Sequence, residues 1–329
     1  MKNDYHLPKY SNKQIVNLFK SNEPFEDLET IRKTEQLLKE KRGYVFRMPP
    51  PKSNVILLLS GGLDTVTMWD MLMRIYQLNV YPVFIRRGQI RMPIEENSVD
   101  FFSGYYRKIH DQYFHPPKKI TTFIPPLEIR WDITKFGTYP INELLECRGI
   151  PMYSSLLSNF AVQYAYYLEI KYAIKTRTIF CGYVPGDGRY LRYENLTALR
   201  TNTHNIISLT GETDWQFTSL AIEKELKIIL TKYDLVKYAD YYHIPIEHTF
   251  SCIKYSYYHC GKCVYCQNKK FVFKKTGIMD KTIYLDRVNF PILTIILNKI
   301  KLMIITFFFS LKIFLELIRS FIYFLQFRY

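Results

Sequence analysis

The chain has 329 residues, of which 48% are hydrophobic and 16% aromatic, so it can bury a sizeable core and is not an intrinsically disordered chain. It carries 45 Lys and Arg residues against 30 Asp and Glu residues, a net charge of +15. This charge either attracts an acidic partner, such as nucleic acid or a membrane surface, or reflects a general bias toward lysine. No basic run is long enough to mark a nucleic-acid-binding arm.

The N-terminal twenty residues lack the apolar core of a signal peptide, so we expect a cytoplasmic protein. The chain has six cysteines. In a reducing compartment, cysteines point to metal binding or chemistry before disulfides.

Helical and strand patterns alternate along most of the chain. Residues 1–52 read as a helical N-terminal extension, with a helix over Glu26–Lys41 and a stiff proline-rich linker at Met48–Asn54. Strands are then predicted at Val55–Leu59, Asn79–Ile85, 118–124 and Thr178–Val184, and helices from about Thr65, at Glu95–Phe114 and at Tyr153–Lys175. The alternation predicts an α/β fold with a doubly wound parallel sheet.

Ligands of such sheets bind at the carboxyl ends of the strands, where Ser60–Asp64 and Gly182–Asp187 are expected to lie. We predict four segments in all: the extension, the α/β domain at 53–250, a cysteine-rich subdomain at 251–288 and an apolar tail at 289–329.

The tail is overwhelmingly apolar but is interrupted by charges. Its longest uncharged stretch in the dense part, Leu302–Leu311, is too short to span a bilayer, which takes roughly 20 residues. On a helix, its polar residues fall on one narrow stripe. We expect this amphipathic helix to dock on its own domain or on a partner, with membrane contact as the alternative.

The stretch SGGLDT, Ser60–Thr65, follows a buried strand and stands where a helix begins. It is not a Walker loop, because no lysine follows the glycines. The N–H groups of Gly61 and Gly62 and the hydroxyls of Ser60 and Thr65 are suited to hold phosphate. Asp64 is suited to hold a magnesium ion that bridges the phosphates.

Four cysteines lie within fifteen residues near the C-terminal end of the predicted α/β domain. They are Cys252, Cys260, Cys263 and Cys266. Cys-x2-Cys spacing lets two thiolates bind one ion, and four thiolates complete a closed tetrahedral zinc site with a structural role. A disulfide pair and coincidental buried cysteines are the alternative interpretations. Cys147 and Cys181 lack partners at such a spacing, and Cys181 is read as a small core residue.

The two signals together resemble the 7-cyano-7-deazaguanine synthase family of queuosine biosynthesis, a group of zinc-containing N-type ATP pyrophosphatases. The resemblance runs from about Asn54 to Thr282. It rests on SGGLDT, on RGQ (Arg87–Gln89), on CGYVPGDGRY, on the ILTKYDLVKYADYYHIPIEHTFSC segment and on CGKCVYCQNKKFVFKKTGIMDKT. It implies a Rossmann-like fold of the adenine nucleotide alpha hydrolase type.

The resemblance also implies a function. The family adenylates the carboxylate of 7-carboxy-7-deazaguanine with ATP, adds ammonia to give an amide, and activates the amide again to give the nitrile. It implies that the SGGLDT loop, Leu63 included, binds ATP, that Ser60 and Asp64 serve catalysis, and that Lys232 contacts nucleotide or substrate. The implied substrate contacts are Gly182, Asp187, Tyr190 and, less directly, Arg148.

The chain also departs from the family pattern. Arg87 stands where the family usually has tyrosine, and Leu191-Arg192-Tyr193-Glu194 where it usually has Pro-Asp-Cys-Arg. The extension and the tail are additions. Relatives in bacterial anti-phage gene clusters act with a protein partner, so a defence role with a protein or nucleic-acid partner is an alternative. A tRNA-thiolating pyrophosphatase is another, and it needs a reactive Cys147 or Cys181. We further expect a homo-oligomer.

Overall fold

The computed structural model describes residues 5–21, 25–88, 91–124, 126, 152–187, 194–253 and 258–287. The chain forms two compact units, Met1–Thr282 and Ile283–Tyr329. In the second unit only Ile283–Arg287 are described, with a 3-10 turn at Leu285–Arg287 (η4). The expectations for the tail therefore lie outside the described residues. The predicted boundaries near residues 52, 250 and 288 stay predictions.

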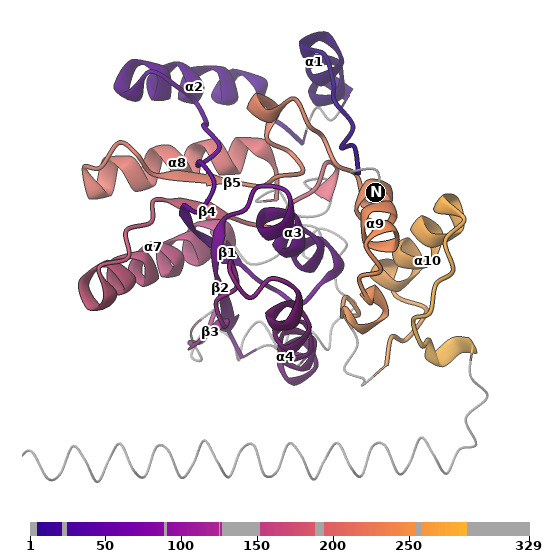
Figure 1. The fold of residues 1–329 in the computed structure, drawn as a ribbon. Helices are drawn as coiled ribbons and strands as arrows, with labels where there is room; N and C mark the ends of the chain where they lie inside the picture. Colours follow the sequence, from indigo (N-terminus) through magenta and orange to yellow (C-terminus); the bar gives the residue numbers. More distant parts are fainter. Residues whose placement is uncertain are drawn as a thin grey trace, which may run out of the picture. The chain divides into compact units, whose positions relative to one another are not determined.

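A five-stranded parallel sheet forms the centre of the first unit (Figure 1). Its strands are β1 (Asn54–Leu58), β2 (Asn79–Arg86), β3 (Lys118–Thr121), β4 (Thr178–Phe180) and β5 (Gln216–Thr218), in the spatial order β3-β2-β1-β4-β5. Ile56 in β1 pairs with Tyr81 on one side and with Ile179 on the other. The predicted α/β fold with a doubly wound parallel sheet is confirmed.

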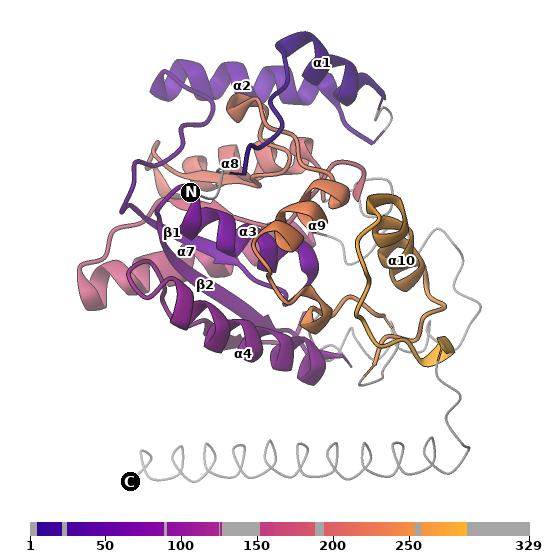
Figure 2. The same ribbon diagram turned by 45° about the vertical axis from the view of Figure 1, so that its right-hand side comes forward.

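Helices cover both faces of this sheet (Figures 1 and 2). Successive side chains of β1 point to opposite faces, because a strand alternates with a period of two. Val55 and Leu57 pack with α3 (Leu63–Arg74), α4 (Met92–Ile109), α9 (Lys232–Tyr241) and α10 (Val264–Thr276). Ile56 and Leu58 pack with α1 (Asn12–Ser21), α2 (Leu28–Arg42), α7 (Tyr153–Tyr172) and α8 (Leu196–Thr210). Both faces are therefore buried, as near-continuous apolar strands require.

The N-terminal extension belongs to one of these two cores. Ile31 and Leu38 of α2 are buried with Leu199 and Ile206 of α8, and the two helices lie side by side in both ribbon views (Figures 1 and 2). A buried ion pair joins them, since Arg200 Nε donates to Glu35 Oε1 at 2.9 Å. The extension is thus fixed to the sheet through α8.

Short elements complete the described chain. Two 3-10 turns, η2 (Lys224–Leu226) and η3 (Ile246–His248), flank α9 in the sequence. None of the helices that the structure describes is long and apolar enough to cross a membrane.

Candidate functional site

The sheet brings the two predicted ligand loops together. The strand order reverses between β1 and β4, and such a reversal opens a crevice beyond the carboxyl ends of the strands. The Ser60–Thr65 loop follows β1, and Gly182–Asp187 follows β4. Gly182 allows the two to approach closely, because a Cβ atom there would lie 2.4 Å from Thr65 Cγ2. The fold therefore brings the two loops together at the carboxyl ends of β1 and β4, as predicted.

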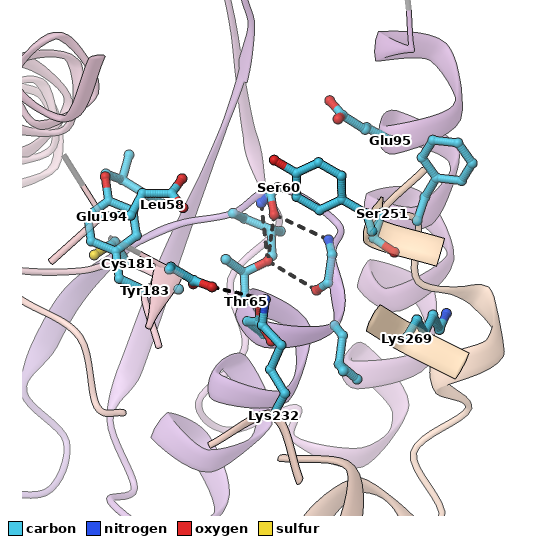
Figure 3. A pocket seen from close by; sticks show the side chains of 18 of the residues that line it. Leu58, Ser60, Thr65, Glu95, Cys181, Tyr183, Glu194, Lys232, Ser251 and Lys269 are labelled. Carbon is cyan, nitrogen blue, oxygen red and sulfur yellow. Dashed lines mark hydrogen bonds and ion pairs between the residues drawn. The ribbon is translucent and has the colours of Figure 1, made fainter. Parts of the chain in front are cut away.

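Hydrogen bonds hold the Ser60–Thr65 loop in a fixed turn. The Ser60 and Thr65 hydroxyls lie 3.0 Å apart, and the Gly62 N–H donates to Ser60 Oγ at 3.2 Å (Figure 3). Gly61 has φ of +75° and lies so close to α4 that a Cβ would be 2.7 Å from Glu95 O. Only glycine fits such a position without strain. The turn leads directly into α3, whose N-terminal N–H groups face the crevice as anion-binding groups do.

Two neighbouring elements fix the loop from outside. Ser98 Oγ on α4 donates to Gly61 O at 2.7 Å, and the Phe250 N–H donates to the same oxygen at 3.0 Å. Phe250 lies two residues before Cys252, the first cysteine of the cluster. The loop and the cysteine-rich segment are therefore joined by a backbone hydrogen bond.

A lysine ammonium group lies between two carboxylates at the centre of the site. Lys232 Nζ is 3.1 Å from Asp187 Oδ1 and 3.6 Å from Asp64 Oδ2. Lys232 begins α9, which the side chains of Thr231 and Asp234 cap in a capping box. Three residues predicted from distant parts of the sequence thus meet in one ionic cluster.

The cluster perturbs the protonation of its members. Burial raises the pKa of the Asp64 carboxyl to about 6, against the opposing effect of the nearby Lys232. Burial opposes the charge on Lys232, but Asp64 and Asp187 outweigh it and raise the pKa of the ammonium group. Asp64 Oδ1 is buried and has no hydrogen-bond partner within the described ranges. A buried carboxylate oxygen of this kind fits a cation such as Mg²⁺, which prefers oxygen ligands.

A cavity of about 300 Å³ opens above the loop. Its walls come from β1, β2, α3, α7, the loop after β4, α9 and α10. The polar and aromatic side chains that line it include Ser60, Asp64, Thr65, Arg87, Arg91, Glu95, Tyr153, Tyr183, Asp187, Glu194, Lys232, Ser251, Tyr265, Asn268 and Lys269. This volume suits a small organic ligand.

Several of these side chains were not predicted. Glu194 and Tyr265 lie in segments compared with the family pattern, but neither was predicted to line the site. Their placement depends on how the chain enters α8 and how α10 packs. Burial, reinforced by the carboxylate of Asp187, raises the pKa of Glu194 to about 8. Lys269 is buried, and burial lowers the pKa of its ammonium group to about 8. Its position three residues after Cys266 was the one feature of the sequence that could have indicated a place near the site.

Some predicted residues lie outside the described ranges. They are Gln89, Cys147, Arg148 and Tyr190. Their proposed roles stay predictions. Cys181, by contrast, is described: it directly follows β4, is 2% exposed, and burial raises the pKa of its thiol.

The four predicted metal ligands converge at the start of α10. The sulfur atoms of Cys252, Cys260, Cys263 and Cys266 all lie within 4.8 Å of one another. Two of the pairs, Cys252 with Cys263 and Cys260 with Cys266, are 3.9 Å apart. The Cys263 N–H also points at Cys260 Sγ, at 3.3 Å. Four sulfurs gathered in this way fit a single bound metal ion, and the predicted metal site is formed.

These features define a class: an α/β protein with a phosphate-type glycine loop at the switch point of a parallel sheet and a four-cysteine metal centre beside it. Within that class, residues 150–277 match the family described as queuosine biosynthesis protein QueC. Curated relatives are the 7-cyano-7-deazaguanine synthases of Brucella ovis and Brucella canis, each 41% identical over 56 residues. That stretch is 17% of this chain and 24% of each relative, so the chain spans about a quarter of the length of the curated relatives it matches.

The resemblance to the 7-cyano-7-deazaguanine synthase family is thereby confirmed over part of the chain. Among solved structures, the U34-tRNA thiolase NcsA from Methanococcus maripaludis, with its [4Fe-4S] cluster, is similar at a TM-score of 0.34 and 12% identity. The similarity covers 75% of this chain and 74% of that one. It is too distant to assign chemistry.

Proposed function

We propose that this chain is an ATP-dependent C–N ligase that converts 7-carboxy-7-deazaguanine and ammonia into 7-cyano-7-deazaguanine. The observation that carries the proposal is the ionic cluster of Lys232, Asp64 and Asp187 over the Ser60–Thr65 loop at the switch point. The match of residues 150–277 to the queuosine biosynthesis family supports it.

ATP would bind with its phosphates against the glycine turn. The N–H groups of the turn and the hydroxyls of Ser60 and Thr65 are suited to the phosphate oxygens. Lys232 would neutralise the charge that develops on the leaving pyrophosphate, as fixed cations do in phosphoryl chemistry. Asp64 would hold a magnesium ion, which supplies further charge neutralisation.

The reaction then has two activation stages. A carboxylate oxygen of the substrate attacks the α-phosphorus of ATP, and pyrophosphate leaves. Ammonia attacks the activated carbonyl carbon, AMP leaves with that oxygen, and an amide forms. A second ATP activates the amide oxygen in the same way, and loss of a second AMP together with the amide protons gives the nitrile.

We propose zinc for the cysteine site. Thiolates 2.3 Å from one tetrahedral ion lie about 3.8 Å apart, close to the 3.9 Å between Cys252 and Cys263 and between Cys260 and Cys266. In an iron–sulfur cluster each thiolate binds a different iron atom, so the four sulfurs would spread further. A four-thiolate site has no open position, so its role would be to hold α10 and the Phe250 segment against the loop.

The defence-type alternative keeps this adenylation chemistry with a protein or nucleic-acid partner, and the N-terminal extension and the C-terminal tail are the segments that would contact it. The thiolation alternative is disfavoured for one of its two cysteines. Cys181 lines the cavity, but its burial and raised pKa oppose formation of the thiolate that sulfur transfer requires.

The test is incubation of the purified protein with ATP, Mg²⁺, ammonia and 7-carboxy-7-deazaguanine, followed by mass spectrometry. We expect AMP, pyrophosphate and 7-cyano-7-deazaguanine. Asp64→Ala should abolish pyrophosphate release, whereas Asp240→Ala, which removes an exposed carboxylate on α9, should not. Turnover of ATP without change in the deazaguanine would refute the proposal.

A further inference from the structure

Glu194 presents a carboxyl group to the cavity. It lines the cavity on the side of Leu58 and Cys181 (Figure 3). Within the residues that the structure describes, its carboxylate has no hydrogen bond or ion pair. A half-buried carboxylate in this state points to donors that a ligand would bring, because a desolvated acceptor without a partner is costly.

The other carboxylates of the site are already engaged. Asp187 Oδ1 accepts from Lys232 at 3.1 Å, and Asp187 Oδ2 accepts from the Val184 N–H at 3.1 Å. Asp64 lies within ion-pair distance of the same lysine. Glu95, the remaining acidic residue among the described cavity residues, pairs with Arg91. Glu194 is therefore the acidic group of the described lining that is left to receive N–H groups of an acceptor substrate.

The backbone that carries Glu194 is held firmly by the N-terminal extension. Asn195, the next residue, caps α8 and donates from Nδ2 to Phe25 O at 2.6 Å. The buried carboxylate of Glu26 accepts from the N–H groups of Leu196 and Thr197 at 2.9 and 3.0 Å. An extension that fixes the start of α8 in this way also fixes where the Glu194 side chain begins.

Aromatic rings line the same cavity. Tyr153, at the start of α7, and Tyr265, at the start of α10, both line it, and the charge of Glu194 contributes to the raised pKa of each hydroxyl. Their rings offer flat surfaces of the kind on which a heterocyclic base stacks. A planar ring with adjacent N–H donors on one edge could stack on these aromatic rings and donate hydrogen bonds to Glu194.

We propose that Glu194 is the specificity-determining residue of the acceptor pocket, and that its carboxyl group binds the substrate in the ionised form and accepts two adjacent N–H bonds from the edge of a guanine-like ring. The ring N–H and the neighbouring 2-amino group supply those donors, and a carboxylate receives such a pair in bidentate fashion. This inference rests on the proposed function and adds the group that recognises the base.

The test compares two probes by calorimetric titration: 7-carboxy-7-deazaguanine and its analogue without the 2-amino group. The wild-type protein should prefer the first by at least about tenfold, the usual effect of one charge-assisted hydrogen bond. Glu194→Gln should lose most of that preference, because affinity for the guanine-like probe falls while affinity for the analogue changes little. ATP affinity should stay within about twofold.

Two further variants act as controls. Glu225→Gln removes an exposed carboxylate outside the cavity and should behave as the wild type. Glu194→Asp keeps the charge on a shorter side chain, and it should retain more of the preference than Glu194→Gln. If Glu194→Gln keeps metal content and ATP binding and still discriminates between the probes as the wild type does, this inference is overturned and the proposed function stands. If the wild-type protein binds neither probe, the proposed function itself fails.

Discussion

Replacing Lys232 with methionine tests the ionic cluster on which the site depends. Methionine keeps the length and most of the packing of the lysine stem but removes the charge that lies 3.1 Å from Asp187 and 3.6 Å from Asp64. The variant therefore leaves two carboxylates facing each other without their cation. Breaking a buried ion pair by removing one partner costs about 3–5 kcal/mol. Since these side chains are about a fifth exposed, we expect about 2–3 kcal/mol at neutral pH.

The loss should depend on pH in a defined direction. The pKa of Asp64 is already raised to about 6, so the folded state binds this proton more tightly than the unfolded state does. Ionisation of Asp64 therefore destabilises the fold as pH rises above about 4. Without Lys232 that penalty grows, because the cation that favours the carboxylate is gone. The difference in stability between variant and wild type should be largest at pH 7–8 and should shrink toward pH 4.

The assay is urea unfolding at several pH values, paired with the rate of AMP and pyrophosphate formation. We expect kcat/KM for ATP to fall at least about 100-fold, equivalent to roughly 3 kcal/mol of transition-state stabilisation. Lys237→Met is the matched control, since Lys237 lies on the same helix with its side chain exposed. If Lys232→Met unfolds and turns over ATP like Lys237→Met, the reasoning about the cluster is wrong.

Two further predictions concern the metal centre and the extension. The protein should copurify with one zinc per chain, and Cys263→Ser should lower zinc content and thermal stability together, because closed thiolate sites contribute folding free energy. Elemental analysis that finds iron, or no metal, would contradict this prediction. Glu35→Gln removes a buried partner of Arg200 and should lower the free energy of unfolding by about 1.5–3 kcal/mol. Glu29→Gln on the same helix breaks an exposed ion pair and should lower it by under about 1 kcal/mol. Equal urea midpoints for the two variants would show that the buried pair does not anchor the extension.

Much of the fold follows from local patterns in the sequence. The predicted strand at Asn79–Ile85 corresponds to β2 at Asn79–Arg86, and the helix predicted at Tyr153–Lys175 corresponds to α7, which ends at Tyr172. Boundaries differ where local geometry intervenes: α7 ends because Ala173 takes φ of 55°. These elements are long or strongly apolar, so the periodicity of their apolar residues is a clear signal in the sequence.

Other parts could not be read from local pattern. α8 was not predicted, because LTALRTNTHNIISLT is rich in threonine and asparagine, which are weak helix formers. It is stabilised instead by the Asn195 and Glu26 caps and by Arg200, which also pairs with the buried Glu223 at 2.7 Å. β5 has only three residues, too few for a period to show. Residues of α8 and Phe217 of β5 are buried in the same hydrophobic core as Ile31 and Leu38 of the extension.

The candidate site divides in the same way. The glycine turn and the cysteine spacing are local motifs, and the structure assembles both. The meeting of Lys232 with Asp64 and Asp187 was not derivable from spacing, since it depends on α9 packing beside α3. Glu194 was noted only as a departure from the family pattern, and its role was not predicted, because that role depends on the cavity to which α7, α9 and α10 contribute.

The most direct test of the account follows one oxygen atom. 7-Carboxy-7-deazaguanine labelled with ¹⁸O in its carboxylate is incubated with the protein, ATP, Mg²⁺ and ammonia, and the AMP is analysed by mass spectrometry. If the carboxylate attacks the α-phosphorus of ATP in this site, ¹⁸O must appear in the phosphate of AMP, and Lys232→Met should lose that labelled product. AMP formed without ¹⁸O, or ADP in place of AMP, would contradict adenylation of the carboxylate.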